Sequence, residues 1–316
     1  MNTHETLTEQ LVMMPIVNPE TGGKSRSFQY AGKVDLVQDN VLIDWKTVAD
    51  TQKYLQAQSI GYQCELYAAA LEEQHGIRIK SAQYRLIQRP TIKYCGKDAD
   101  RQAYEDRCVE WLTEKPHALV TEERMLNPVR MSAARHMLWN ASKRILENRR
   151  TGVWLQNEAG CHTWGRECPY MSLCLAESRG SDVSDTIAAS YCERQHAHSE
   201  LGDVLGELEA LTYSSTKTLG VCERKYYWSK ERNLSPGQEE TGTALYIGSA
   251  VHEGMEALIQ SDEKSALERI DQWADENPVI GGDAFQRQEQ DIARARAIVR
   301  VANMKWFDGA DLVSTE

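Results

Sequence analysis

The sequence predicts an α/β fold, or its α+β variant, because strand and helix patterns alternate along the first half and helical patterns dominate the second. Residues 28–47 mix aromatic and β-branched side chains around a polar turn at residues 38–40, which predicts a β-hairpin. An apolar stripe at helical spacing then runs through Tyr62 and stops at Gly76. Residues 81–88 alternate as a strand does. These elements together predict a sheet with helices packed against it.

The rest of the chain is predicted to be helical, apart from one loop-rich segment. Residues 98–148 predict two long helices, which Pro116 and Pro128 interrupt. Residues 151–175 are rich in Gly, Cys and Trp, which indicates a loop. Residues 216–307 return to a helical pattern. We find no repeat of fixed period, which excludes a solenoid.

The composition is that of a globular protein, with 316 residues, 41% of them hydrophobic and 26% charged. No apolar run is long enough for a membrane helix, and residues 1–10 are too polar for a secretory signal, so we expect a cytoplasmic protein without a membrane partner. The formal net charge of −11 argues against a protein that coats duplex DNA by charge alone. Local basic clusters exist, with solvated helix faces as their alternative interpretation. These clusters are Lys143, Arg144, Arg149 and Arg150; Arg224, Lys225, Lys230 and Arg232; and Arg294, Arg296 and Arg300.

Two carboxylates and a lysine gather in the predicted hairpin. On a strand, Asp44 and Lys46 point to one face and Trp45 to the other, towards the core. The hairpin brings Asp35 close to Asp44. Paired carboxylates on a largely apolar sheet suit Mg²⁺ or Mn²⁺, and such an ion polarises a phosphodiester. Lys46 can orient the attacking water or offset charge on the phosphate. The alternative is a surface ion pair between Asp44 and Lys46.

The hairpin residues carry a family resemblance. Gly32-Lys-Val-Asp35 followed by Asp44-Trp-Lys46 resembles the second and third motifs of RecB-type PD-(D/E)XK nucleases. The resemblance implies a restriction-endonuclease-like mixed sheet flanked by helices. It also implies that Asp35, Asp44 and Lys46 are catalytic.

A downstream helix carries a further motif. Gln63-Cys-Glu-Leu-Tyr67 is similar to the Gln-x-x-x-Tyr motif of the same family, and its two ends lie one helical turn apart on one face. Gln58 and Tyr62 share this spacing. The resemblance implies that Gln63 and Tyr67 lie beside the active site, where they position DNA or the catalytic lysine. An ordinary amphipathic helix is the alternative.

Three cysteines crowd into one short stretch: Cys161, Cys168 and Cys174. In a cytoplasmic chain such spacing suggests metal before disulfide. Thiolates suit either zinc or an iron–sulfur cluster, and His162 could complete a zinc site. The other cysteines before residue 200 have no ligand-like neighbours and are expected to be ordinary thiols. They are Cys64, Cys95, Cys108 and Cys192.

A fourth cysteine comes from the second half of the chain. Residues 214–228, which contain Cys222, resemble the segment that opens RecB-like iron–sulfur nucleases, where one cysteine precedes the nuclease core and three follow it. The Cys168-Pro-Tyr sequence and the final Cys174 resemble that trailing triplet. The Trp-Gly-Arg spacer after Cys161 is similar to a phage exonuclease variant. The resemblance implies that these four cysteines hold a [4Fe-4S] cluster, with zinc as the alternative.

A histidine motif follows. Gly248-Ser-Ala-Val-His252-Glu253 resembles the first motif of the family, Gly-x-x-x-His-Glu. The resemblance implies that His252 is a metal ligand beside Asp35 and Asp44, and that Gly248 allows its helix to approach closely. A lone histidine is more often no ligand at all, so the position of His252 after the cysteine segment is what favours the role.

The order of the motifs differs from that of the resembled family, where the cysteine and histidine segments come first. Here residues 1–201 carry the hairpin, the Gln-x-x-x-Tyr helix and the cysteine triplet, and residues 202–316 carry the family's opening segments. We expect one circularly permuted nuclease domain, with a cysteine-rich, metal-stapled subdomain and the former ends joined across residues 202–211. A dimer with swapped halves and a gene cut at the ends of a circular sequence are the alternatives.

The sequence therefore predicts a Mg²⁺- or Mn²⁺-dependent DNA exonuclease. The resemblance implies action on DNA ends, often on single strands, in recombination, repair or phage replication, and a CRISPR-adaptation nuclease is a close variant. Partner proteins from those processes and the oligomeric state stay open. The rival from another class is a non-catalytic, metal-stapled DNA-binding module.

Overall fold

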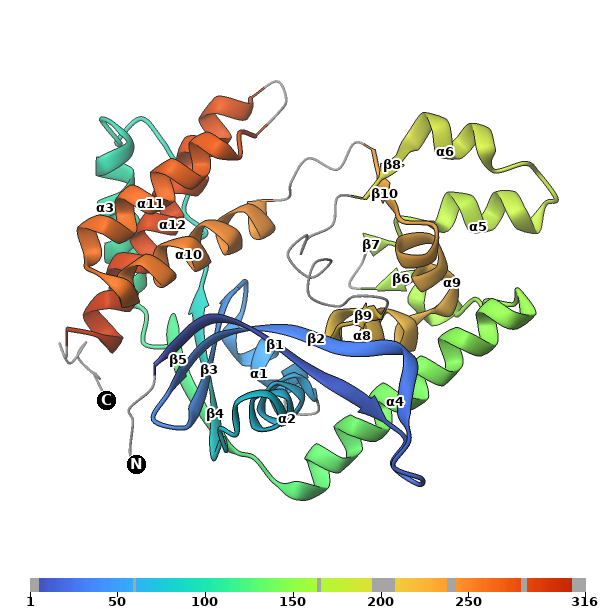
Figure 1. Cartoon of the computed structure of the whole chain (residues 1–316). Helices are drawn as coiled ribbons and strands as arrows, with labels where there is room; N and C mark the ends of the chain where they lie inside the picture. Colours follow the sequence, from blue (N-terminus) through green and yellow to red (C-terminus); the bar gives the residue numbers. More distant parts are fainter. Residues whose placement is uncertain are drawn as a thin grey trace.

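The computed structural model describes residues 6–58, 61–163, 166–194, 208–237, 243–279 and 283–308. Within them, a six-stranded mixed sheet runs in the order β1-β2-β3-β4-β5, and a short strand, β9, pairs with β2 (Figure 1). Its strands are β1 (Leu7–Val17), β2 (Lys24–Gln38), β3 (Val41–Val48), β4 (Ser81–Gln88), β5 (Leu119–Met125) and β9 (Glu209–Leu211). The β3–β4 and β2–β9 pairs are parallel, and the other pairs are antiparallel.

The predicted hairpin is confirmed as β2 and β3, which pair in antiparallel register. Asp39 and Asn40 form its turn at φ angles of 53° and 64°, a left-handed conformation that short polar side chains tolerate. The parallel step from β3 to β4 needs a crossover, which α1 (Thr51–Gln58) and α2 (Gln63–His75) supply. Gly76 ends α2 at a φ of 68°, as the sequence predicts.

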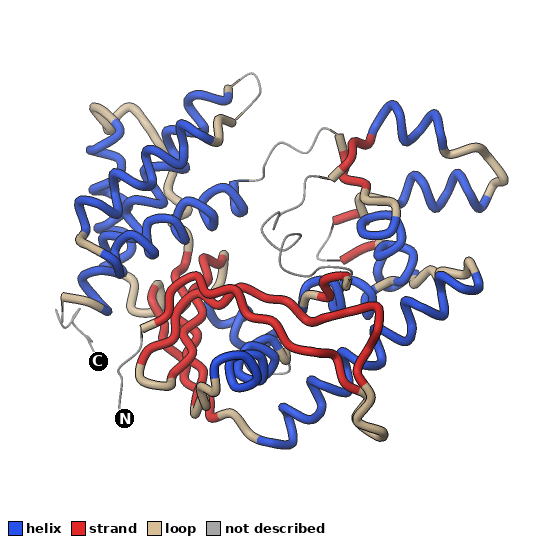
Figure 2. The backbone as a smooth tube through the Cα atoms, in the orientation of Figure 1, coloured by secondary structure: helices blue, strands red, loops and turns tan. Residues whose placement is uncertain are grey.

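Helices cover both faces of the sheet (Figure 2), so the predicted class, a mixed sheet flanked by helices, is confirmed. The first core cluster joins α2 and α4 (Pro128–Thr151) to one face. The second joins the other face to four helices: α3 (Arg101–Glu114), α10 (Thr243–Gln260), α11 (Glu263–Glu276) and α12 (Ala284–Trp306). Ile43 and Trp45 belong to the second cluster and Leu42 to the first, as alternation along β3 requires.

Strands β1 and β5, like β9, lie outside the sequence-based expectation. In β1, the alternate residues Val12, Met14 and Ile16 are buried. The strand also contains polar residues, which weaken its pattern in the sequence. β5 occupies the break between α3 and α4, and most of its residues are exposed and polar, so it carries little alternating apolar signal.

A third, smaller core lies in the cysteine-rich part of the chain, at the upper right of Figure 1. It unites Tyr170 and Leu173 from the first half with Trp228 and Leu234 from the second. The elements around it are the 3₁₀ helix η1 (Glu158–Gly160), β6 (His162–Thr163), β7 (Arg166–Glu167), α5 (Met171–Ser178), α6 (Ser184–Ser190), β8 (Tyr191–Glu193), α8 (Tyr213–Val221), α9 (Glu223–Tyr226), the π-helix η3 (Tyr227–Glu231) and β10 (Leu234–Pro236).

The expected linker at residues 202–211 is only partly described. Residues 202–207 lie outside the described part of the chain. Residues 209–211 are not a linker, because they form β9 and pair in parallel with β2 inside the central sheet.

Several arginines of the basic clusters hold the fold together. Arg296 and Arg300 on α12 both bind Glu105 of α3, at 2.6 Å and 2.9 Å, and Glu105 is 1% exposed. Arg144 on α4 binds Glu223 at 2.6 Å. Arg296 and Arg300 therefore stabilise the packing of α12 on α3 and do not form a solvated helix face, because their side chains are only 13% and 21% exposed. Among the described helices, none combines the length and the apolar character that crossing a membrane requires.

Candidate active site

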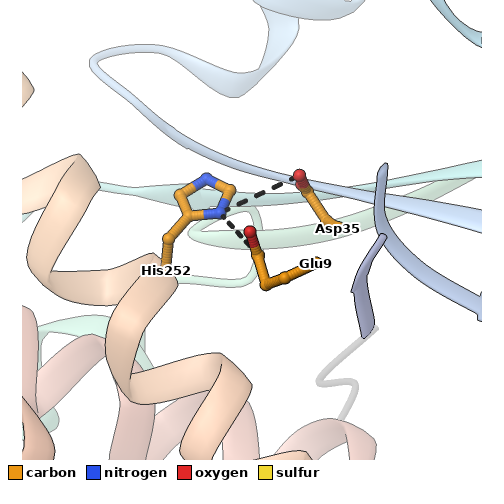
Figure 3. A group of neighbouring side chains, drawn as sticks. All are labelled: Glu9, Asp35 and His252. Carbon is orange, nitrogen blue, oxygen red and sulfur yellow. Dashed lines mark ion pairs between the residues drawn. The ribbon is translucent and has the colours of Figure 1, made fainter. Parts of the chain in front are cut away.

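Three ligand-type side chains meet where β1, β2 and α10 come together (Figure 3). The Nδ1 atom of His252 lies 3.7 Å from Oε1 of Glu9 and 3.9 Å from Oδ1 of Asp35. One potential ligand atom from each of the three residues lies within 4.8 Å of the others. Two carboxylates and an imidazole form a donor set that suits a divalent cation.

Glu9 reaches this position through the register of β1 against β2. The residues on either side of Glu9 pair with those on either side of Asp35, so the two face each other. The backbone of Glu9 has a φ of 48°, which is uncommon for a residue other than glycine and is the kind of strain that gathers at functional sites. Sequence reasoning missed Glu9, although the apolar run over residues 11–17 was a signal for a buried strand that follows it.

His252 lies on α10, in the second half of the chain. This helix buries Val251 and Met255 in the second core cluster. The side chain of His252 points towards the edge of the sheet, where Glu9 and Asp35 lie (Figure 3). A Cβ atom at Gly248 would lie 3.3 Å from Oγ1 of Thr47, so the helix approaches β3 closely at this glycine. The close approach expected at Gly248 is thus present.

Asp44 and Lys46 lie beside Asp35 on the hairpin. The Nζ atom of Lys46 is 2.8 Å from Oδ1 of Asp44 and 3.8 Å from Oδ2 of Asp35. Asp44 is 1% exposed, and although Lys46 pairs with its Oδ1, its Oδ2 has no hydrogen-bond partner in the described part of the chain. Buried oxygens in that state are stabilised by a cation, so the residues present fit a divalent ion.

Burial and neighbouring charge shift the pKa values of Asp44, Lys46 and Glu9. Burial raises the pKa of Asp44 despite the nearby ammonium of Lys46. Burial lowers the pKa of Lys46, but Asp44 and Asp35 outweigh it and raise that pKa well above its ordinary value. Burial likewise raises the pKa of Glu9, but hydrogen bonds with His252 and Lys33 bring it below the ordinary value. Lys46 therefore stays cationic and Glu9 stays anionic.

A cleft of about 440 Å³ joins the group of Glu9, Asp35 and His252 to the predicted Gln-x-x-x-Tyr pair. Gln63 and Tyr67 line it together with Glu9, Asp35 and His252. The Nε2 atom of Gln63 donates to the hydroxyl of Tyr67 at 2.9 Å. The structure thus brings both motif residues to the same cleft as the proposed cation ligands.

Gly32→Ala is expected to lower nuclease activity about tenfold and to destabilise the fold by about 1–3 kcal/mol. A Cβ atom at Gly32 would lie 2.6 Å from Cε1 of Tyr67, so the ring must move and its contact with Gln63 must loosen. Cleavage rates and thermal melting would measure both effects. Gly96→Ala is the matched control, since a Cβ atom at Gly96 meets nothing within 4 Å. Equal behaviour of the two variants would contradict the role of the Tyr67 ring.

Glu9→Gln is expected to weaken the binding of Mn²⁺ about tenfold or more, because it removes one anionic oxygen from the donor set and keeps the side-chain shape. Calorimetric titration of the protein with Mn²⁺ measures the change. Gln10→Ala, one residue along β1, is the control. A Glu9→Gln variant with unchanged Mn²⁺ affinity would remove Glu9 from the site.

The four predicted cysteine ligands come from two places that the fold unites. A Cβ atom at Gly160 would lie 3.4 Å from Cβ of Cys222, so Cys222 adjoins the residue before Cys161. The backbone N of Cys168 donates to the carbonyl of Cys161 at 2.7 Å. Cys168 and Cys174 pack against the small third core. Burial, followed by the charges of Cys168 and Cys222, raises the pKa of the Cys161 thiol. The role of these cysteines as ligands stays a prediction.

Comparison with known proteins bears on the whole site. The model of the PD-(D/E)XK nuclease superfamily matches residues 4–175 and 210–308. No curated protein matches the chain. The matched segments include the strands of Glu9, Asp35, Asp44 and Lys46 as well as the helix of His252. Members of this superfamily generally hydrolyse phosphodiester bonds in nucleic acids and typically use Mg²⁺ or Mn²⁺. From the matched segments, which cover most of its length, the chain belongs to the PD-(D/E)XK nuclease superfamily.

Proposed function

We propose that the protein is a RecB-like, Mg²⁺- or Mn²⁺-dependent DNA exonuclease. The observation that carries this proposal is the meeting of Glu9, Asp35 and His252 beside the buried Asp44–Lys46 pair. These residues come from three separate parts of the chain, and a structural ion pair would not require all of them.

Each residue of the site has a distinct chemical task. A divalent cation held by Asp35, Asp44, Glu9 and His252 would polarise the scissile phosphate and make water a stronger nucleophile. Lys46 is held between two carboxylates, where its ammonium orients the attacking water or offsets negative charge that develops on the phosphate. The Gln63–Tyr67 pair lines the same cleft and positions the substrate.

The resemblance suggests a single strand or a DNA end as substrate. The cleft that would receive it has a volume of about 440 Å³ and is lined by Glu9, Asp35 and His252. Recombination, repair, phage DNA processing and CRISPR adaptation are the processes that the resemblance suggests, and their proteins would be the partners.

We further propose that Cys161, Cys168, Cys174 and Cys222 hold a [4Fe-4S] cluster, with zinc as the alternative. Both groups take thiolate ligands, so four cysteine sulfurs could hold either one. The contacts that bring Cys222 beside the loop of Cys161 and Cys168 support a shared site.

The same contacts support a circularly permuted single domain. Cys222 adjoins the cysteine loop and His252 adjoins Asp35 within one chain, although each pair is far apart in sequence. The rival interpretation is a non-catalytic DNA-binding module. It is less favoured because Asp35, Asp44 and Lys46 keep both the identities and the arrangement that hydrolysis needs.

Cleavage of end-labelled DNA by the full chain tests the proposed function. We expect linear single strands to be degraded with Mg²⁺ or Mn²⁺ and to survive in EDTA. Circular single strands of the same sequence should persist if cleavage begins at ends. Cleavage of circles at the same rate would replace the exonuclease with an endonuclease. Binding of DNA without any cleavage would favour the non-catalytic module.

A further inference from the structure

The cleft has a second wall that the proposed cation site leaves unused. This wall is the junction of β9 and α8, whose residues line the same cleft as Glu9, Asp35 and His252. Its lining residues are Thr212, Tyr213, Ser214 and Lys217. The parallel pairing of β9 with β2 fixes α8 in this position. Ser214 and Lys217 stand one turn apart on α8, so both reach the cleft from the same side.

Lys217 differs from the other lysines near the site. Lys46 binds Asp44 at 2.8 Å, and Lys33 binds Glu9 at 2.7 Å. The exposed side chain of Lys217 has no ion pair or hydrogen bond with any residue that the structure describes. Its ammonium is therefore available to negative charge that enters the cleft.

The floor of the cleft supplies a second, independent observation. Tyr30 lines the cleft and is 0% exposed, yet its hydroxyl has no hydrogen-bond partner in the described part of the chain. Buried hydroxyls are nearly always bonded, so this one lacks a partner that a ligand could provide. The ring of Tyr67 lies beside this hydroxyl, because a Cβ atom at Gly32 would lie 3.0 Å from the hydroxyl and 2.6 Å from Cε1 of Tyr67.

We propose that Lys217, with the hydroxyls of Ser214 and Tyr30, binds the phosphodiester next to the one held at the cation site. The assignment presupposes the nuclease function proposed above and deepens it. An ammonium and two hydroxyls are typical partners of phosphate oxygens, and such contacts position a strand without selecting its sequence. The substrate is then a continuous single strand that runs from the carboxylates to α8.

Salt-dependent binding of a fluorescein-labelled single-stranded oligonucleotide tests this assignment. All variants carry Lys46→Ala, so that the bound strand stays intact, and anisotropy is measured with Mg²⁺ over a range of KCl concentrations. Each phosphate contact to a single strand contributes a slope of about −0.7 in log K against log[salt]. Adding Lys217→Ala should therefore reduce the slope by about 0.7 and weaken binding about fivefold at about 0.1 M salt.

Three further variants sharpen the result. Lys217→Arg should restore the slope, because it keeps the charge. Tyr30→Phe should weaken binding and leave the slope unchanged, because its hydroxyl is neutral. Lys264→Ala is the control, since Lys264 on α11 is 85% exposed and outside the cleft lining, and it should change neither quantity.

An affinity and slope that Lys217→Ala leaves unchanged would overturn the assignment. So would an equal loss from Lys264→Ala, since the effect would then be one of net charge. Cleavage by the chain with Lys46 intact is measured in parallel. Binding that depends on Lys217 without any cleavage would refute only the nuclease, whereas cleavage without dependence on Lys217 would refute only this subsite.

Discussion

Asp44→Asn and Lys46→Ala are each expected to lower kcat for Mg²⁺-dependent DNA cleavage by at least about a hundredfold. Asp44 offers buried oxygens to the cation, and Lys46 places its ammonium 2.8 Å from one of them. Both groups act on charge that develops in the transition state, so the rate should fall far more than the affinity for DNA. Single-turnover kinetics and binding of the same oligonucleotide separate the two effects.

The two variants should differ in stability. Lys46→Ala leaves the carboxylate of Asp44, which is 1% exposed, without its ammonium, and such a loss is expected to cost about 1–3 kcal/mol. Asp44→Asn instead removes a charge that burial disfavours, as the raised pKa of Asp44 indicates. We expect it to melt close to the wild type without divalent cations. Asp44→Asn is therefore the cleaner test of catalysis, because a loss of activity there cannot be assigned to unfolding.

A matched control exists in the same hairpin. Asp39→Asn makes the same chemical change in the turn between β2 and β3, outside the cleft lining, and Asn tolerates its φ of 53°. It should cleave DNA as the wild type does. Full activity of Asp44→Asn and Lys46→Ala would place the chemistry elsewhere or indicate a contaminating nuclease.

The hairpin could be predicted from sequence because its signals are local. Alternation along β3 sends Trp45 into one core and leaves Asp44 and Lys46 on the other face, whatever the rest of the chain does. Gly76 ends α2 through its own left-handed backbone. The spacing of Gln63 and Tyr67 follows from helical geometry alone. In each case the local pattern and the fold agree.

The missed elements depend on contacts between distant segments. β9 is three residues long and exists because β2 offers it a partner. Glu9 joins the site only through the register of β1 and β2, and a strand with mixed polarity gives a weak signal by itself. The expectation for His252 came from the resemblance, since a lone histidine on a helix predicts no neighbour. Its proximity to Asp35 is a property of the packing of α10 against the sheet.

Cys222→Ser is expected to lower the melting temperature of the metal-loaded protein by about 10 °C. Metal binding at a structural site contributes to the free energy of folding, so the loss of one ligand removes part of that contribution. It should also remove the brown colour expected of protein purified without oxygen, if iron is the native metal. Serine suits this test. The sulfur of Cys222 caps α9 by accepting from the backbone N of Lys225 at 3.5 Å, and serine is a strong N-cap residue. The helix cap survives the change, so the loss of stability reports on metal alone.

The two halves should remain associated in this variant, although more loosely. Glu223 accepts hydrogen bonds from Arg144 and Asn148 of α4, and Tyr170 donates to the carbonyl of Leu234 at 2.7 Å. These contacts need no metal. Limited proteolysis should therefore cut the cysteine-rich segment faster in Cys222→Ser and leave the central sheet protected.

Cys192→Ser is the control, because Cys192 is exposed on β8 and outside the predicted ligand set. It should keep the metal content, the colour and the melting temperature of the wild type. Elemental analysis distinguishes iron from zinc in both proteins. A Cys222→Ser protein with unchanged metal content and stability would exclude Cys222 as a ligand. The contact between Gly160 and Cys222 would then be ordinary packing, and the proposed permutation would rest on His252 and Asp35 alone.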